Sequence, residues 1–154
     1  MHVVAVTLGL VGVGALAPMA FGSPPSGFTA TPLVIANFDD TVHLNSDRIK
    51  FQTKDPTDVT VQKIVIDPGG SSGWHHHPGI VIIAVQSGSV TFWDSDCNKS
   101  TYGPGLPNGA VLTEAGDERG QVTSAEGATT YATLIAPSAN PPVFRIEDDP
   151  PPCA

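Results

Sequence analysis

The sequence is poor in charged side chains. Of its 154 residues, 7 are Lys or Arg and 15 are Asp or Glu, which is 14% of the chain against about 25% in an average domain. A long solvated helix or a coiled coil needs more charge than this. Polyanion binding needs a basic patch, whereas the net charge is −8, so we expect no nucleic-acid partner. The 40% apolar content, despite 16 Gly and 15 Pro, indicates one domain with a packed core.

Charge is missing altogether from residues 1–38. The apolar run at 3–21 ends in Ala20-Phe21-Gly22, which fits the small-x-small rule for signal peptidase cleavage. We therefore expect a signal peptide over 1–22 and a secreted, extracytoplasmic protein with no stable membrane insertion after cleavage. No Lys or Arg precedes the run, so an uncleaved anchor is the alternative.

Cysteine is also scarce, with Cys97 and Cys153 as the only pair. In an exported protein, an isolated pair usually forms one disulfide, which here would join the proline-rich tail to the loop at 94–98. Two free thiols and an intermolecular link are the alternatives. Two distant cysteines without a neighbouring histidine do not form a zinc motif.

Long amphipathic helices are absent outside the apolar run at 3–21. Short stretches rich in Val, Ile, Phe and Thr alternate with Gly/Pro turns, which is typical of an all-β sandwich or barrel. The stretch 80–94, with Ser87-Gly88 between two β-type runs, predicts a hairpin. Residues 23–31 are expected to form a proline-rich flexible or extended arm, and 32–154 to form the barrel domain.

The most informative segment contains Trp74, His75, His76 and His77. In an extended chain, His75 and His77 share one face and His76 points to the other. Two imidazoles at this spacing can hold one divalent metal, but they cannot close the site alone, because four to six ligands are needed. The alternative is a polar histidine patch that binds no metal. Trp74 and His76 are candidates for contact with a bound ligand, although Trp74 could equally pack at the rim.

Four residues, Gly69, His75, His77 and Gly88, fall on the spacing of the first cupin motif, which is Gly, five residues, His-x-His and a later Gly. On these residues the sequence resembles small secreted single-domain cupins. The resemblance implies a double-stranded β-helix (jelly-roll) barrel whose interior can hold a divalent transition metal such as Fe, Mn, Ni, Cu or Zn. Secreted members also end in a Pro-Cys tail, which supports the Cys97–Cys153 pairing.

The departures from the cupin pattern concern the metal ligands. The glutamate of the first motif falls on Val81, which cannot ligate, and the histidine of the second motif falls on Gln121, which could offer only an amide oxygen. No histidine follows His77. The predicted set is therefore His75, His77 and Gln121. Four other side chains could complete it: His43, His76, Glu114 and Glu118.

The sequence thus predicts an exported single-domain cupin that binds a small polar ligand in its barrel, with at most a weak or incomplete metal site. The alternative is a metal-dependent cupin enzyme of dioxygenase or isomerase type that uses His75 and His77. A third reading is a structural or interaction protein with a filled barrel. Cupins often dimerise through sheet edges, so a homodimer is also considered, whereas the substrate and the catalytic residues stay open.

Overall fold

The computed structural model describes residues 23–152 and 154. The predicted signal peptide at 1–22 lies outside these residues, and so does Cys153. The Cys97–Cys153 disulfide therefore stays a prediction.

All regular structure among the described residues is β-strand. The strands are β1 (Ser26–Phe38), β2 (His43–Asn45), β3 (Lys50–Gln52), β4 (Thr57–Ser71), β5 (His75–His76), β6 (Ile80–Gly88), β7 (Val90–Asp94), β8 (Lys99–Tyr102), β9 (Val111–Ala115), β10 (Gly120–Ser124), β11 (Ala128–Pro137) and β12 (Ile146–Glu147). Within residues 23–152 and 154, no helix is long and apolar enough to cross a membrane.

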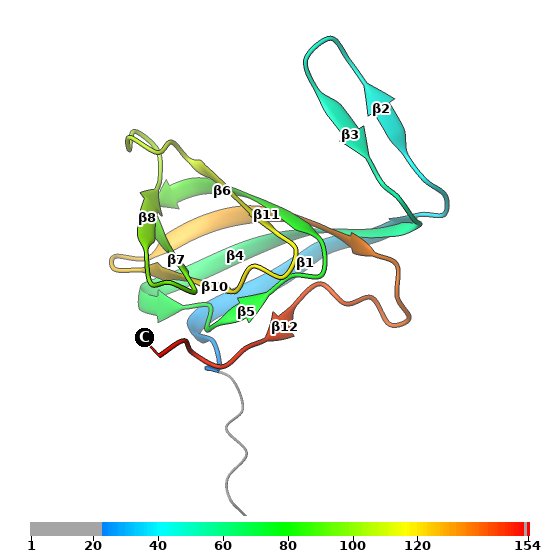
Figure 1. Ribbon diagram of the computed structural model, residues 1–154. Coiled ribbons are helices and arrows are strands. Elements are labelled where there is room, and N and C mark those ends of the chain that lie inside the picture. Colours follow the sequence, from blue (N-terminus) through cyan, green and yellow to red (C-terminus); the bar gives the residue numbers. More distant parts are fainter. Residues whose placement is uncertain (1–22, 153) are drawn as a thin grey trace, which may run out of the picture.

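Ten of the strands form one antiparallel sheet that curls into a nearly closed barrel (Figure 1). The order is β12-β5-β10-β4-β11-β6-β9, with β1 added to β4, β7 to β10 and β8 to β7. Along the long strands, buried and exposed residues alternate with a period of two, so one face of each strand lines the barrel interior. In β6, for example, Val81, Ile83 and Val85 are buried, whereas Ile80 and Ile82 are exposed. The predicted all-β barrel is confirmed.

The hairpin predicted over 80–94 is not formed. The strand β6 pairs with β11 and β9, whereas β7 pairs with β10 and β8. The chain turns at Gly88, which has φ +72°, and a Cβ there would lie 2.1 Å from the carbonyl oxygen of Gly127. This close approach lets the chain leave one wall of the barrel for the other, which is the jelly-roll crossover.

The predicted flexible arm at 23–31 is mostly part of the barrel. Strand β1 begins at Ser26 and pairs antiparallel with β4, with Phe28 opposite Ile66. Phe28 also packs against the hydrophobic core, so both backbone pairing and apolar burial hold this stretch in place. Pro32 is accommodated at a register shift before Val34. Of the two conformations expected for this segment, flexible or extended, the structure shows the extended one, and from Ser26 onward the segment is paired in the sheet.

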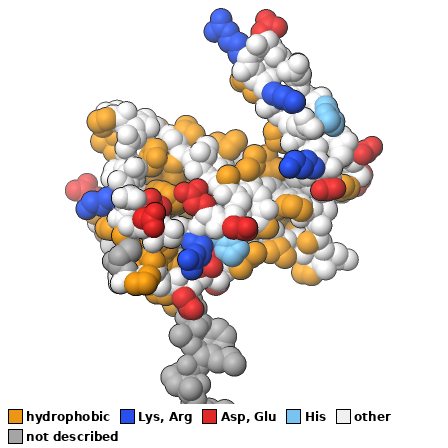
Figure 2. Space-filling model, in the orientation of Figure 1, with side chains coloured by type: hydrophobic (Ala, Val, Ile, Leu, Met, Phe, Trp, Pro, Cys, Tyr) orange, Lys and Arg blue, Asp and Glu red, His pale blue; other side chains and the backbone are white. Residues whose placement is uncertain are grey.

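A separate hairpin made of β2 and β3 projects from the barrel (Figure 1). The hairpin and the residues just after it carry three of the seven basic residues of the chain. Arg48 lies in the turn between β2 and β3, Lys50 lies on β3, and Lys54 follows β3. Figure 2 shows these basic side chains on the projection, together with a histidine. The rest of the described chain therefore carries most of the acidic excess.

The C-terminal segment closes one end of the barrel. Strand β12 pairs with β5, placing Ile146 opposite His76 and Glu147 opposite His75. Just before β12, Phe144 packs against the hydrophobic core. This segment therefore lies against the histidine strand and takes part in the site described next.

Candidate metal centre

Three buried side chains converge at this end of the barrel: His75, His77 and Glu114. One possible ligand atom from each lies within 4.8 Å of the others. His75 belongs to β5, His77 follows it, and Glu114 lies on β9. The period of two places both histidines on the inner face as predicted, and their rings meet edge to face with centroids 4.8 Å apart.

Hydrogen bonds to main-chain carbonyls fix the orientation of both rings. His75 Nδ1 lies 2.9 Å from the carbonyl oxygen of Gly73, and His77 Nδ1 lies 2.5 Å from that of Phe144. A carbonyl oxygen only accepts, so each Nδ1 must carry the hydrogen. In a neutral ring this leaves the Nε2 lone pair free, which is the arrangement that metal-binding histidines adopt.

The third side chain faces one of these nitrogens directly. His77 Nε2 lies 3.2 Å from Glu114 Oε2, and both side chains are buried. With Nδ1 already donating to Phe144, a neutral His77 has no hydrogen to offer the carboxylate. The contact is favourable when a cation joins the two groups, either the second proton of an imidazolium or a bound metal ion, and the buried donor set fits a metal ion.

The other histidine is held in its neutral form. Burial, with a smaller effect from the nearby Arg145 guanidinium, lowers the pKa of His75 from 6.5 to about 4, although the hydrogen bond to Gly73 and the Glu114 carboxylate oppose this shift. At neutral pH, His75 is therefore uncharged, the only state in which imidazole can ligate a metal.

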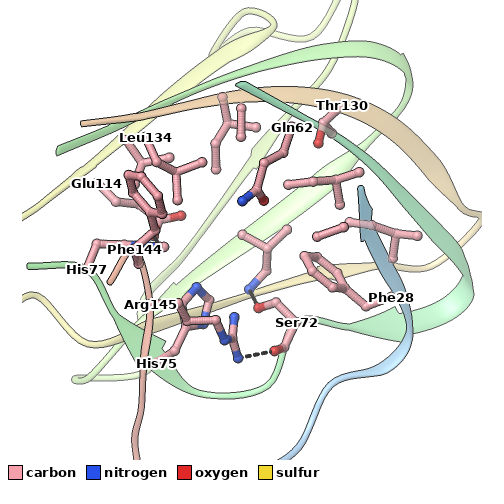
Figure 3. A pocket seen from close by; sticks show the side chains of 17 residues that line it. Phe28, Gln62, Ser72, His75, His77, Glu114, Thr130, Leu134, Phe144 and Arg145 are labelled. Carbon is pink, nitrogen blue, oxygen red and sulfur yellow. Dashed lines mark hydrogen bonds and ion pairs between the residues drawn. The ribbon is translucent and has the colours of Figure 1, made fainter. Parts of the chain in front are cut away.

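A cavity of about 190 Å³ opens beside the three side chains (Figure 3). Besides His75, His77 and Glu114, its polar lining consists of Gln62, Ser72, Thr130 and Arg145. The apolar lining consists of Phe28, Ala30, Ile64, Ile66, Val81, Ile83, Val122, Ala132, Leu134 and Phe144. The barrel interior is therefore not filled by side chains, which argues against a purely structural barrel.

Comparisons with solved structures bear on this barrel. A cupin-2 domain protein from Rhodospirillum rubrum superposes with a TM-score of 0.52 at 12% identity, over 82% of this chain and 68% of that one. The chain has a cupin fold. A cupin domain from Bordetella pertussis aligns at 18% identity over 73% of this chain and 95% of that one, with a TM-score of 0.45. A sugar phosphate isomerase of the cupin superfamily from Silicibacter pomeroyi aligns at 17% identity over 52% and 51%, with a TM-score of 0.43. No family model and no curated protein sequence matches the chain.

The carboxylate of this site comes from a different strand than the cupin motif implies. Val81, the position of the motif glutamate, is the Cα partner of Glu114 across β6 and β9, and both residues line the cavity. In this chain a carboxylate therefore lies on the neighbouring strand, at the same level of the barrel as Val81. Alternation in β9 is the sequence signal for it, because Leu112 and Glu114 share the inner face.

The predicted ligand Gln121 does not join this site. Its Oε1 accepts a hydrogen bond of 3.0 Å from Ser71 Oγ. Its neighbour Val122 lines the cavity, so the period of two turns Gln121 to the other face of β10. Gln121 therefore lies outside the cluster of His75, His77 and Glu114, because the approximate spacing to the second motif is one residue out of phase with the inner face.

Trp74 and His76, predicted to contact a bound ligand, lie outside the cavity lining. Trp74 is only 2% exposed, and its backbone is bound by Ser23 and Asp148. His76 points to the opposite face from its neighbours and forms a 2.7 Å hydrogen bond with Asp148. Both residues thus hold neighbouring segments of the chain against β5.

Of the four side chains considered for completing the site, Glu114 alone belongs to the cluster among the described residues. His43 is exposed on the β2–β3 hairpin, and Glu118 is exposed in the turn after β9. His76 is turned away, as described above. The structure therefore brings together two imidazoles and one carboxylate, whereas the sequence pattern predicted two imidazoles and an amide.

Proposed function

We propose that this cupin is a metal-dependent enzyme that acts on a small molecule held in the barrel cavity. The observation that carries the proposal is the buried convergence of His75, His77 and Glu114, each with a free ligand atom, within 4.8 Å. This set replaces the expected weak or incomplete site. It also favours the alternative of a metal-dependent enzyme over that of a metal-free binding protein.

The number of protein ligands supports catalysis over a structural role. Structural metal sites are closed by four protein ligands, whereas catalytic sites keep positions open for water or substrate. Three ligands beside a cavity leave such positions open. Two imidazoles and one carboxylate are the ligand set of mononuclear Fe(II) oxygenases, which makes iron the first metal to test among Fe, Mn, Ni, Cu and Zn. When bound, the metal would supply Lewis acidity and, as iron, redox chemistry.

The residues of the chain have distinct roles in this proposal. His75 and His77 present Nε2, held in place through the carbonyls of Gly73 and Phe144. Glu114 adds a negative charge, so this ligand set attracts a divalent cation more strongly than an uncharged ligand set would. The apolar barrel wall excludes water around these groups, which strengthens electrostatic interactions inside the cavity.

Metal titration of chelator-treated protein tests the proposal. One equivalent of Co²⁺ is expected to bind and to give the visible absorption spectrum of a nitrogen- and oxygen-ligated site. Glu114→Gln should weaken Co²⁺ binding at least about tenfold, as loss of a first ligand exceeds the 10–100-fold effects of outer-shell groups. The matched control Glu118→Gln removes an exposed carboxylate from the same β9–β10 region and should leave binding unchanged.

A second matched pair separates the buried histidine from an exposed one. His75→Ala should abolish stoichiometric binding, whereas His43→Ala on the projecting hairpin should not change it. Binding at several equivalents that is indifferent to both pairs of variants would show adventitious surface sites and reject the proposal.

We further propose that the mature protein is exported, begins near Ser23 and carries a Cys97–Cys153 disulfide. The support is the charge-free apolar segment at 1–22 and the single cysteine pair. Intact mass and peptide mapping of protein from the native host would test both points. A homodimer remains a prediction, to be checked by light scattering.

A further inference from the structure

The size of the cavity restricts what it can hold. A volume of about 190 Å³ corresponds to about six water molecules at roughly 30 Å³ each. Sites for drug-sized ligands usually measure about 300–1,000 Å³. A nucleotide or an oligosaccharide would extend out of this open cavity, so the cavity itself suits a molecule of few heavy atoms.

The walls of the cavity indicate a molecule with an apolar body. Most lining residues are aliphatic or aromatic, and Phe28 lies across the cavity from His77 and Glu114 (Figure 3). A small inorganic anion or a polyol would leave this wall in contact with polar groups or water. Burying an alkyl chain there is favourable by about 0.8 kcal/mol per methylene.

The metal end of the cavity carries a positive charge once a divalent ion is bound. Both imidazoles are neutral as ligands, and Glu114 contributes one negative charge, so one positive charge remains. The neighbouring Arg145 and Glu147 form an ion pair, with Nε to Oε1 at 2.6 Å and Nη2 to Oε2 at 2.9 Å, and cancel each other. An anionic group would neutralise this end.

Arg145 also has unused hydrogen-bond donors. It lines the cavity, and its guanidinium is fixed by Glu147 and by a 2.6 Å bond from Nη2 to the carbonyl oxygen of Ser72. These contacts occupy Nε and Nη2 and leave Nη1 without a hydrogen-bond partner among the described residues. A guanidinium that is already held in place loses little entropy on binding an oxyanion, and its planar fork suits a carboxylate.

We infer that the ligand of this cavity is a small carboxylate with an apolar body. Its carboxylate lies between the metal and Arg145 Nη1, and its body lies along the apolar wall toward Phe28. The inference rests on the proposed metal site. Gln62 points into the same cavity from β4 and has no hydrogen-bond partner among the described residues, which fits a further polar atom on the ligand body (Figure 3).

A ligand series on wild-type protein loaded with Co²⁺ tests this without any variant. The acids from acetate to hexanoate should perturb the Co²⁺ spectrum, with affinity rising roughly fourfold per methylene. Hexanamide, which has the shape of hexanoate without its charge, should bind at least about tenfold more weakly. Inorganic phosphate should bind no better than acetate.

Variants then locate the carboxylate. Arg145→Gln should weaken hexanoate binding at least about tenfold, whereas Arg119→Gln, at an exposed arginine in the β9–β10 turn, should not change it. Arg145→Lys should recover only part of the loss, because the fixed fork is missing. Co²⁺ stoichiometry and thermal stability are measured for each variant, so that a misfolded Arg145 variant is recognised and the wild-type series decides.

The two proposals fail in different ways. Loss of stoichiometric Co²⁺ binding rejects the metal site, and with it the ligand assignment. Normal Co²⁺ binding with equal affinity for hexanoate and hexanamide, or with no dependence on chain length, overturns the carboxylate assignment and leaves the metal site standing.

Discussion

The Nε2 atom of His77 lies 3.2 Å from the Oε2 atom of Glu114, although the Nδ1 hydrogen of the same ring is already donated to the carbonyl of Phe144. A neutral ring therefore turns an unprotonated nitrogen toward the carboxylate, and a cation, either a second proton or a metal ion, is needed to make this contact favourable. Both side chains are buried, so bulk water screens this contact only weakly. The pair makes sense as two ligands of one metal ion, with His75 as the third.

The first prediction exchanges the carboxylate between two strands. Val81 and Glu114 are Cα partners on β6 and β9, and both face the cavity. Glu114→Val should reduce Co²⁺ affinity at least about tenfold, and adding Val81→Glu should restore a substantial part of it, because a carboxylate returns to the same level of the barrel. Calorimetric titration of the three proteins provides the comparison. Absence of any recovery in a folded double variant would contradict the idea that the two positions are interchangeable.

The second prediction concerns the turn that leads into the histidines. Gly73 and Gly69 both have positive φ, +69° and +76°, but a Cβ on Gly73 would lie 2.0 Å from the carbonyl oxygen of Ser23, whereas a Cβ on Gly69 meets nothing within 4 Å. Gly69→Ala should lower the free energy of unfolding by about 1–2 kcal/mol through backbone strain alone. Gly73→Ala should cost more than this and should also weaken metal binding, because His75 Nδ1 bonds to the Gly73 carbonyl. Equal effects in denaturant titrations would show that the close contact is unimportant.

The third prediction is a loss of stability in acid. In the folded, metal-free protein, burial and Arg145 lower the pKa of His75 from 6.5 to about 4. Between these values the unfolded chain binds a proton that the folded chain does not, so the free energy of unfolding falls as the pH falls. The contribution of His75 to the free energy of unfolding is fully present above pH 6.5. It decreases by up to about 3 kcal/mol as the pH falls to 4.

The comparison that isolates this group is His75→Gln, studied by urea unfolding across the same range. The free energy of unfolding of the variant should depend less steeply on pH than that of the wild type, whatever the absolute stability of the variant. Parallel curves for the two proteins would mean that His75 is protonated as easily in the folded state as in the unfolded chain.

The fourth prediction concerns the unpartnered amide in the cavity. Gln62→Leu should raise the free energy of unfolding of the ligand-free protein by about 1 kcal/mol, because an apolar side chain replaces an amide that has no hydrogen-bond partner among the described residues and packs against Ile64 and Ile66. The control Gln86→Leu, at an exposed site on β6, should change stability by less than about 0.5 kcal/mol. A destabilised Gln62→Leu protein would indicate that the amide serves the fold rather than a ligand. A functional site commonly reduces stability in this way.

Much of the fold follows from local patterns in the sequence. The runs rich in Val, Ile, Phe and Thr between Gly/Pro turns predict strands in a barrel, and the spacing of His75 and His77 places both imidazoles on one face. Strand pairing is different, because it depends on contacts far apart in the chain. The turn at Gly88 resembles a hairpin turn in sequence, yet it carries the chain between two walls of the barrel.

Motif spacing could not predict the carboxylate of the candidate site for a similar reason. Glu114 joins the histidines only through the register of β9 against β6, which brings it opposite Val81. A motif count along the chain instead points to Gln121, which lies on the outward phase of β10. Strand phase is a stronger guide than motif distance here, because a shift of one residue moves a side chain to the other face.

Anomalous diffraction from crystals of the chelator-treated protein soaked with Co²⁺ tests the central claim most directly. A single dominant peak is predicted inside the barrel, about 2.0–2.2 Å from His75 Nε2, His77 Nε2 and a carboxylate oxygen of Glu114. A well-ordered crystal with no peak among these three side chains, or with cobalt bound only at surface residues such as His43, would contradict it.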